Sequence, residues 1–130
     1  MLKFPEAIFI LSFTLSSCSL MSNTGTNTLI KESSNKRHHK KAILFLKEAG
    51  ATVTDSYQVT VCDNDHTLDK GEVGNAFTVD TDHGKTWLDS SSINFTWLSS
   101  DTLQIDYDKK LRTFIQENIV QEVTLIYKAR

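Results

Sequence analysis

Residues 93–107, INFTWLSSDTLQIDY, decide the fold. Large apolar side chains occupy every second position on both sides of a short polar segment, Ser99-Ser100-Asp101; they are Ile93, Phe95, Trp97, Leu103, Ile105 and Tyr107. A period of two is typical of a β-strand with one buried face, and Ser and Asp are common turn residues. The stretch therefore predicts a β-hairpin, whose cross-strand aromatic and aliphatic pairs stabilise a small sheet.

Shorter runs on either side of this hairpin predict further strands. Residues 41–48, KAILFLKE, are apolar at both alternating sets of positions, which predicts a central strand buried on both faces. Residues 55–62 predict a half-buried strand, and residues 76–80 and 123–128 predict two more. Residues 109–121 are ambiguous, because their apolar positions fit helical spacing as well as a strand.

These segments predict a mainly β fold: a small antiparallel sandwich or partial barrel of about six strands. One short helix near residues 109–121 is the open alternative. The 130 residues are enough for one domain, and they include 14 Lys and Arg against 16 Asp and Glu. Because this balance gives no overall positive field, the sequence predicts no nucleic-acid partner.

The first 17 residues differ in composition from the rest of the chain and are expected to be a signal peptide. Lys3 precedes a nine-residue apolar stretch, residues 7–15. As a helix this stretch would rise only about 14 Å, roughly half the hydrocarbon thickness of a bilayer. It therefore predicts the apolar region of a signal peptide rather than a membrane span.

The signal segment ends in Leu15-Ser16-Ser17-Cys18, which resembles the lipobox of bacterial lipoproteins. The resemblance implies a diacylglyceryl group on the Cys18 sulfur, acyl chains such as palmitate, and a mature chain that begins at Cys18. Several acyl chains hold a protein stably at a membrane. Because Ser19 is not Asp, the resemblance also implies the outer membrane of a Gram-negative cell, facing the periplasm. The alternative is an ordinary signal peptide, in which case Cys18 and Cys62 could form a disulfide.

Residues 18–35 are rich in Ser, Asn and Thr, which predicts a lipidated cysteine followed by a flexible tether. The β-rich domain is then expected at residues 36–130. It begins with a basic cluster, Lys36-Arg37-His38-His39-Lys40-Lys41. One interpretation gives Lys36, Arg37 and Lys40 a contact with anionic lipid phosphates or another partner. The favoured interpretation is a solvated turn that leads into a strand.

The domain carries three motifs that occur together: Gly50-Ala51-Thr52, Gly74-Asn75-Ala76-Phe77, and Trp97 followed by Leu103-Gln104-Ile105-Asp106-Tyr107. Over about residues 40–127 it resembles a family of small uncharacterised bacterial β-domains. In that family an opening strand leads into a Gly-Ala-Thr turn, and a Trp-containing strand pairs with an L-x-I-x-Y strand. The resemblance implies a β fold and no particular activity.

Two polar segments hold candidate metal ligands. The loop DNDHTLD, residues 63–69, is rich in carboxylates, but an EF-hand needs Gly and Glu where this chain has Leu68 and Gly74. An irregular carboxylate site of Asp63, Asp65 and Asp69 is one open alternative. A transition-metal site of His66, Asp82 and His83, with Asp80 beside them, is another, if two turns at one end of a sheet lie close together. Solvated acidic loops and surface histidines are the default interpretation.

Trp87 stands apart from the other aromatic residues. It lies among turn residues in HGKTWLDSSS, residues 83–92, which predicts either an exposed aromatic anchor for a partner or a side chain that covers the edge of the domain. No spacing typical of nucleophilic catalysis or of a phosphate-binding loop occurs. The sequence therefore predicts no catalytic residue, and no cofactor besides the lipid on Cys18.

The sequence favours a binding module that is anchored by lipid in the bacterial envelope. The expected partner is an envelope protein, as for an inhibitor or immunity lipoprotein, or a cell-surface polymer. A metal-dependent envelope enzyme that uses His66, Asp82 and His83 is one alternative, and a purely structural envelope lipoprotein is the other.

Overall fold

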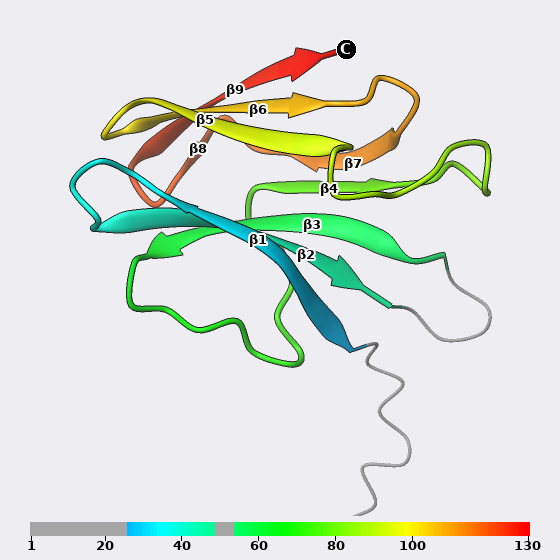
Figure 1. The fold of residues 1–130 in the computed structure, drawn as a ribbon, viewed down its shortest axis with the longest axis horizontal. Coiled ribbons are helices and arrows are strands. Elements are labelled where there is room, and N and C mark those ends of the chain that lie inside the picture. The colour runs from blue at the N-terminus through cyan, green and yellow to red at the C-terminus, as the bar shows by residue number, and fades with distance from the viewer. Residues whose placement is uncertain (1–25, 49–53) are drawn as a thin grey trace, which may run out of the picture.

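Two layers of β-sheet make up the part of the chain that the computed structural model describes, residues 26–48 and 54–130 (Figure 1). These residues form nine strands and no helix. The strands are β1 (Asn27–Ser34), β2 (Lys40–Lys47), β3 (Ser56–Asp63), β4 (Phe77–Asp80), β5 (Ile93–Ser99), β6 (Thr102–Tyr107), β7 (Arg112–Gln116), β8 (Ile119–Val120) and β9 (Val123–Ala129). One sheet has the order β1-β2-β3-β4-β7 and the other the order β5-β6-β9-β8.

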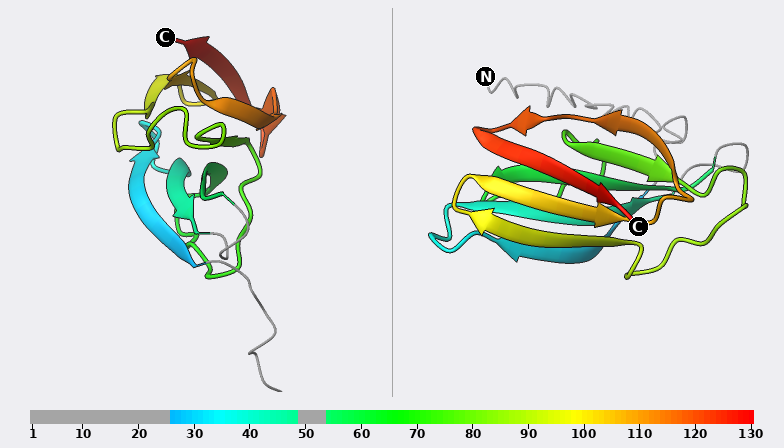
Figure 2. Two further views of the ribbon diagram at one scale, coloured as in Figure 1. Left: turned by 90° about the vertical axis from the view of Figure 1, so that its right-hand side faces the viewer. Right: turned by 90° about the horizontal axis from the view of Figure 1, so that it is seen from above.

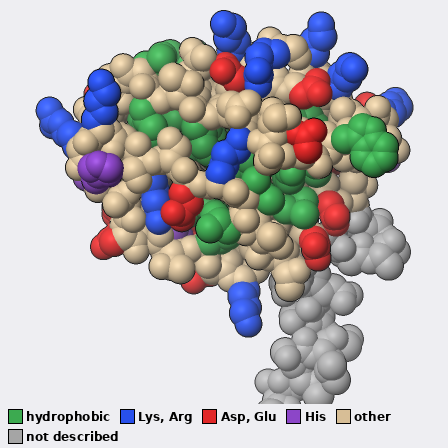
Figure 3. Space-filling model, in the orientation of Figure 1, with side chains coloured by type: hydrophobic (Ala, Val, Ile, Leu, Met, Phe, Trp, Pro, Cys, Tyr) green, Lys and Arg blue, Asp and Glu red, His purple; other side chains and the backbone are tan. Residues whose placement is uncertain are grey.

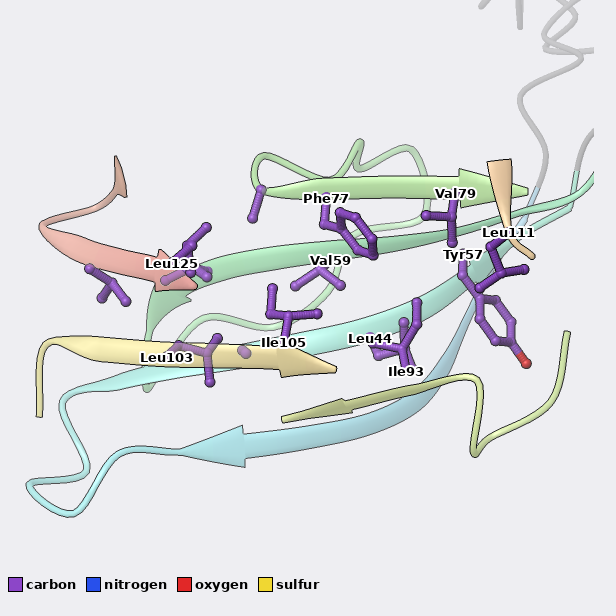
Figure 4. Close-up of a cluster of buried hydrophobic side chains, with 14 residues drawn as sticks. Leu44, Tyr57, Val59, Phe77, Val79, Ile93, Leu103, Ile105, Leu111 and Leu125 are labelled. Carbon is purple, nitrogen blue, oxygen red and sulfur yellow. The ribbon is translucent and has the colours of Figure 1, made fainter. Parts of the chain in front are cut away.

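The two sheets lie face to face as separate layers and do not close into a barrel (Figure 2). This arrangement confirms the predicted mainly β fold and makes it a sandwich rather than a partial barrel. The core between the sheets is apolar, and Figure 4 shows its side chains pointing into the space between the two layers. Phe77 is fully buried in this core, with its ring centroid 5.1 Å from those of both Tyr107 and Tyr127.

The inner strands of the first sheet are buried on both faces. Ala42 and Leu44 of β2 face the core between the sheets, whereas Ile43 and Phe45 form a second apolar cluster with Cys62. The prediction for β2 is therefore confirmed. The prediction of a half-buried β3 is wrong, because its residues 57–62 are all buried. A loop of residues 64–76 covers the outer face of this sheet, on the side away from the second sheet (Figure 1).

The predicted hairpin is confirmed as β5 and β6, which pair from Ile93↔Tyr107 to Ser99↔Thr102. One strand pair departs from the predicted antiparallel arrangement, because β6 pairs with β9 in parallel. Residues 109–121, the ambiguous segment, form β7 and β8 and no helix. β7 crosses to the first sheet and pairs with β4, whose backbone groups would otherwise be unpaired on that side. The prediction of about six strands does not include β1, β7 and β8, and these three account for the difference from the nine strands described.

The predicted domain boundary at residue 36 is wrong, because β1 belongs to the first sheet. β1 pairs with β2 from Asn27↔Lys47 to Ser34↔Lys41, with a bulge between Leu29 and Lys31. Its polar composition suggested a tether, but an edge strand can satisfy its backbone by pairing while its polar side chains face water. The signal peptide at residues 1–17 and the lipidated cysteine at Cys18 lie outside the described residues. In the described part, no helix exists to span a membrane.

The turn after β1 is attached to the second sheet. Asn35, fully buried, donates from Nδ2 to the carbonyl of Ser100 at 2.7 Å. Trp97 donates from Nε1 to the carbonyl of Ser33 at 3.0 Å. These bonds join the two layers across one edge, so β1 is part of the folded domain.

Candidate functional site

Trp87 lies on the connection between β4 and β5, residues 81–92, and its side chain is 85% exposed. The connection begins with a turn in which Asp82, His83 and Gly84 have positive φ angles. The turn is closed by a bond from the Thr86 amide to the Thr81 carbonyl, at 3.2 Å. Trp87 therefore projects from a connection held by backbone hydrogen bonds. Of the two alternatives, its exposure agrees with an exposed side chain and not with one that covers the edge of the domain.

Asp89 fixes the second half of this connection. Its Oδ1 accepts from the Ser91 amide at 2.7 Å and from the Ser91 hydroxyl at 2.5 Å. The bonds from Ser91 hold the pKa of the Asp89 carboxyl below its ordinary value. The Ser92 hydroxyl accepts from the Asp89 amide at 3.1 Å and donates to the Trp87 carbonyl at 3.4 Å. The backbone on both sides of Trp87 is thus ordered before any ligand arrives.

A hollow of about 480 Å³ lies beside Trp87, which we call the Trp87 hollow. Its lining is otherwise polar or charged: Thr86, Asp89, Ser91, Ser92, Asp108, Lys109, Lys110 and Arg130. The parallel pairing of β6 with β9 places the residues after Tyr107 beside Arg130. The Lys109 amide donates to the Arg130 carbonyl at 2.9 Å, and the Asp108 amide donates to the Ser92 carbonyl at 3.0 Å.

Cations outnumber carboxylates around this hollow. Lys109, Lys110 and Arg130 line it against Asp89 and Asp108. Lys31 of β1 lies alongside and donates to the carbonyl of Ser90 at 2.6 Å. Burial, and then the positive charge of Arg130, lower the pKa of Lys31. The site can therefore offer an aromatic face, several hydrogen-bonding groups and a modest excess of positive charge.

The basic cluster lies at the other end of the first sheet. In the sheet register, Lys40 lies opposite Asp63, the last residue of β3. Asp80, which directly precedes the Trp87 connection, lies opposite Ser56, the first residue of β3. Lys36 and Arg37 are exposed on the turn between β1 and β2, which confirms the solvated turn. Lys40 Nζ lies 2.7 Å from Asp63 Oδ1. The structure thus does not bring these three basic residues together with Trp87. In Figure 3, charges of both signs are interspersed over the face shown.

The expected metal group of His66, Asp82 and His83 is not assembled. His83 Nε2 lies 3.0 Å from Arg112 Nη1, beside the ion pair of Arg112 with Asp80. His66 Nε2 lies 2.7 Å from Glu72 Oε1 instead. In the described residues, His66, Asp69 and Glu72 form the one group of three whose ligand atoms are all within 4.8 Å of one another. The alternative of a metal-dependent enzyme that uses His66, Asp82 and His83 therefore lacks its site.

A second hollow, of about 720 Å³, contains this group, and we call it the His66 hollow. Asp63 and Asp65 line it as well, but Asp63 is paired with Lys40. Cys62 also lines it, as a free and buried thiol. Burial raises the pKa of this thiol to about 11, so it is protonated at neutral pH and not a nucleophile.

Sequence reasoning missed the residues that complete each hollow. Lys109, Lys110 and Arg130 carry no local signal, because the parallel β6 and β9 pair brings them to Trp87 from distant positions. Glu72 has a weak signal, since His66, Asp69 and Glu72 follow one another at three-residue intervals.

No family model matches the chain, and neither a curated protein nor a solved structure matches it. The site must therefore be interpreted from its own geometry.

Proposed function

We propose that this protein is a lipid-anchored bacterial envelope protein that binds an anionic, sugar-containing polymer of the cell envelope through the Trp87 hollow. The observation that carries the proposal is the 85% exposure of Trp87 on an ordered connection. A large aromatic side chain left in water costs free energy unless a partner covers it. Its surroundings determine which kind of partner fits.

The hollow favours a hydroxyl-rich ligand over a protein. Binding hot spots between proteins lie in fully desolvated pockets, surrounded by contacts that contribute little energy but exclude water. Hollows of about 300 to 1,000 Å³ are typical of small-molecule sites. Around Trp87, Ser, Thr, Asp and Lys side chains line a hollow of about 480 Å³. The negative face of the indole attracts the positively polarised C–H groups on one side of a sugar ring. Hydroxyl groups of the sugar can bond to the Ser91 and Asp89 side chains.

The charged side chains of the Trp87 hollow further restrict the class of ligand. Counting side chains alone, Lys109, Lys110 and Arg130 exceed Asp89 and Asp108 by one positive charge, and Lys31 lies alongside. Acidic groups on the polymer would pair with these cations, and such exposed pairs weaken with added salt. The proposal therefore includes binding that decreases as ionic strength rises.

The anchor part of the proposal rests on the lipobox sequence and on the length of chain before the domain. Because β1 begins at Asn27, only residues 19–26 separate Cys18 from the first strand. Eight residues reach at most roughly 28 Å when fully extended. A lipid on Cys18 would thus hold the domain close to the membrane surface.

Binding can be tested by co-sedimentation of the full chain with protein-free envelope polysaccharide. We expect Trp87→Ala to abolish most of the binding, because stacking on an aromatic side chain supplies the main apolar contact. Phe114→Ala is the matched control, since Phe114 is 55% exposed on β7, away from the hollow. Equal binding by Trp87→Ala and the unchanged chain would overturn the proposal. Binding to untreated envelopes but not to the protein-free polymer would identify a protein partner instead.

The anchor is tested by labelling cells with radioactive palmitate. We expect Cys18→Ala to lose the label and Cys62→Ala to keep it, because Cys62 is buried in the fold. Label that persists in Cys18→Ala would contradict the lipoprotein assignment without affecting the binding experiment.

A further inference from the structure

We propose that His66, Asp69 and Glu72 form a binding site for a divalent transition-metal cation, with zinc as the best match. This site is independent of the Trp87 hollow and of the lipid anchor. The three residues lie on the loop between β3 and β4, and each turns one potential ligand atom toward the others.

The spacing of the ligand atoms suits a small cation. All three atoms lie within 4.8 Å of one another, and His66 Nε2 and Glu72 Oε1 are 2.7 Å apart. With metal–ligand bonds of about 2.1 Å, the ligands of a tetrahedral zinc ion lie about 3.4 Å apart. Shifts of roughly an ångström in side chains would therefore accommodate the ion. The cation would replace the hydrogen bond that now joins His66 to Glu72.

Glu72 Oε1 also accepts from the Asp69 amide at 3.3 Å, but bonds outside the three side chains hold the loop in place as well. Asn27 donates from Nδ2 to the carbonyl of Asp69 at 2.8 Å and to that of Glu72 at 2.9 Å. At the other end, the Asn75 side chain forms two hydrogen bonds with the backbone of Val61, both 2.9 Å long. Ligands fixed by the surrounding fold bind a metal more tightly, because less freedom is lost on binding.

A buried hydroxyl provides a second, independent sign of a ligand. Thr60 is only 4% exposed and lines the His66 hollow, yet its Oγ1 has no hydrogen-bond partner among the described residues. Buried polar atoms are rarely left unpaired without a functional reason or a bound water. The hydroxyl lies near the Glu72 carboxylate but is not placed for a regular hydrogen bond with it. A water molecule on the cation would give Thr60 its partner.

The donor set determines the class of metal. One imidazole nitrogen with two carboxylates suits zinc and similar cations, whereas calcium and magnesium prefer oxygen ligands alone. Three protein ligands also leave one coordination position open toward the hollow. The site would therefore take zinc in preference to calcium or magnesium.

The test is a zinc titration of the full chain in a Cys18→Ser background, monitored by isothermal calorimetry after removal of metals. We expect one zinc ion per chain, no saturable binding of calcium or magnesium, and a higher unfolding temperature with zinc. His66→Asn should weaken zinc binding by at least about tenfold, since even the outer-shell partners of zinc ligands contribute about 10- to 100-fold. Glu72→Gln should do the same while keeping the size of the side chain, so it serves if His66→Asn does not fold.

Two control variants separate this site from other zinc ligands. His38→Asn removes an exposed imidazole at a position whose φ of 54° Asn tolerates, and it should bind zinc as the unchanged chain does. Cys62→Ala should also bind normally, because the thiol is no member of the group. Absence of saturable zinc binding, equal binding by His66→Asn and Glu72→Gln, or loss of binding in either control would overturn the proposal.

Discussion

The first sheet is covered on both faces, but by different kinds of structure. Its inner face packs against the second sheet through a wholly apolar cluster that includes Phe77. Its outer face is covered by the loop 64–76, which adds only Leu68 to a small apolar cluster and is otherwise attached by hydrogen bonds. The Gly74 amide donates to Gln58 Oε1, Asn27 donates to two loop carbonyls, and Asn75 donates to the Val61 carbonyl. We therefore assign most of the stability to the packing of the second sheet, which we call the inner cover. The loop 64–76, the outer cover, is expected to open more easily and to carry the proposed ligand site.

The sharpest test of this difference removes one apolar side chain from each cover. Phe77→Ala should lower the free energy of unfolding by about 3–5 kcal/mol, because a large cavity opens in a fully buried core. Leu68→Ala should cost only about 1 kcal/mol, since Leu68 is half-buried. Urea denaturation measures both changes. Equal losses would contradict the difference between the covers.

The attachment of the outer cover can be broken at a glycine. A Cβ on Gly74 would lie 2.9 Å from Gln58 Cβ and 2.9 Å from the Val59 carbonyl, where the β3 backbone cannot move away. Gly74→Ala should therefore cost about 1–3 kcal/mol by overpacking. Gly71→Ala is the matched control in the same loop, because nothing lies within 4 Å of its added Cβ. Thermal unfolding should separate the two variants clearly.

Beyond this loop, the outer face carries an ion pair. Arg112 Nη2 lies 2.6 Å from Asp80 Oδ2, and Nε lies 3.0 Å from Oδ1. Burial alone would raise the pKa of Asp80, but the hydrogen bonds from Arg112 outweigh it and lower this pKa. The stabilisation is therefore complete above the unfolded pKa, near 4, and is lost as the pH falls through the lower folded value.

Replacing Asp80 tests this contribution. Asp80→Asn should cost about 1 kcal/mol at pH 7, because Arg112 is more than a third exposed and water screens the pair. It should also flatten the acid side of the stability profile, measured by urea denaturation from pH 6 to pH 2. An unchanged acid slope in Asp80→Asn would show that this pair does not stabilise the outer face.

The smallest expected effect is on local opening of the loop 64–76, and not on the free energy of global unfolding. Cys62 lies beneath the outer cover, and burial raises the pKa of its thiol to about 11. In a Cys18→Ser background, a thiol reagent at pH 8 should therefore react slowly. Leu68→Ala should speed the reaction by roughly fivefold, since a change of about 1 kcal/mol acts directly on local opening. Ile126→Ala, on the exposed face of the second sheet, should leave the rate unchanged.

The strands with strong hydrophobic patterns could be predicted, and the edge elements could not. The hairpin of residues 93–107 and the doubly buried β2 follow from apolar periodicity alone. The composition of β1 predicts a tether, because an edge strand is stabilised by backbone pairing, which its side chains do not reveal. Residues 109–121 were ambiguous because β7 has few apolar contacts of its own and follows the free edge of β4.

The candidate sites show the same limit. The turn-rich neighbours of Trp87 left open whether it is exposed or packed on the domain edge, and Arg130 and Lys109 reach it only through the register of parallel strands. The sequence predicts His66 as a candidate ligand, but the residues that it groups with His66 are not the ones that the structure places beside it. Asp82 and His83 lie after β4, near Arg112, while Glu72 is on the loop that folds back beneath β3.

The position of β1 also determines how the domain would respond to mechanical load. A pull on the chain before residue 26 acts on the first residue of an edge strand that pairs with β2 alone. Hydrogen bonds to β2 would then break one after another from Asn27, as in unzipping. The rupture would stop near Ser33 and Asn35, where Trp97 and Ser100 of the other layer hold the backbone. A tethered domain built this way would lengthen under force before it loses its core.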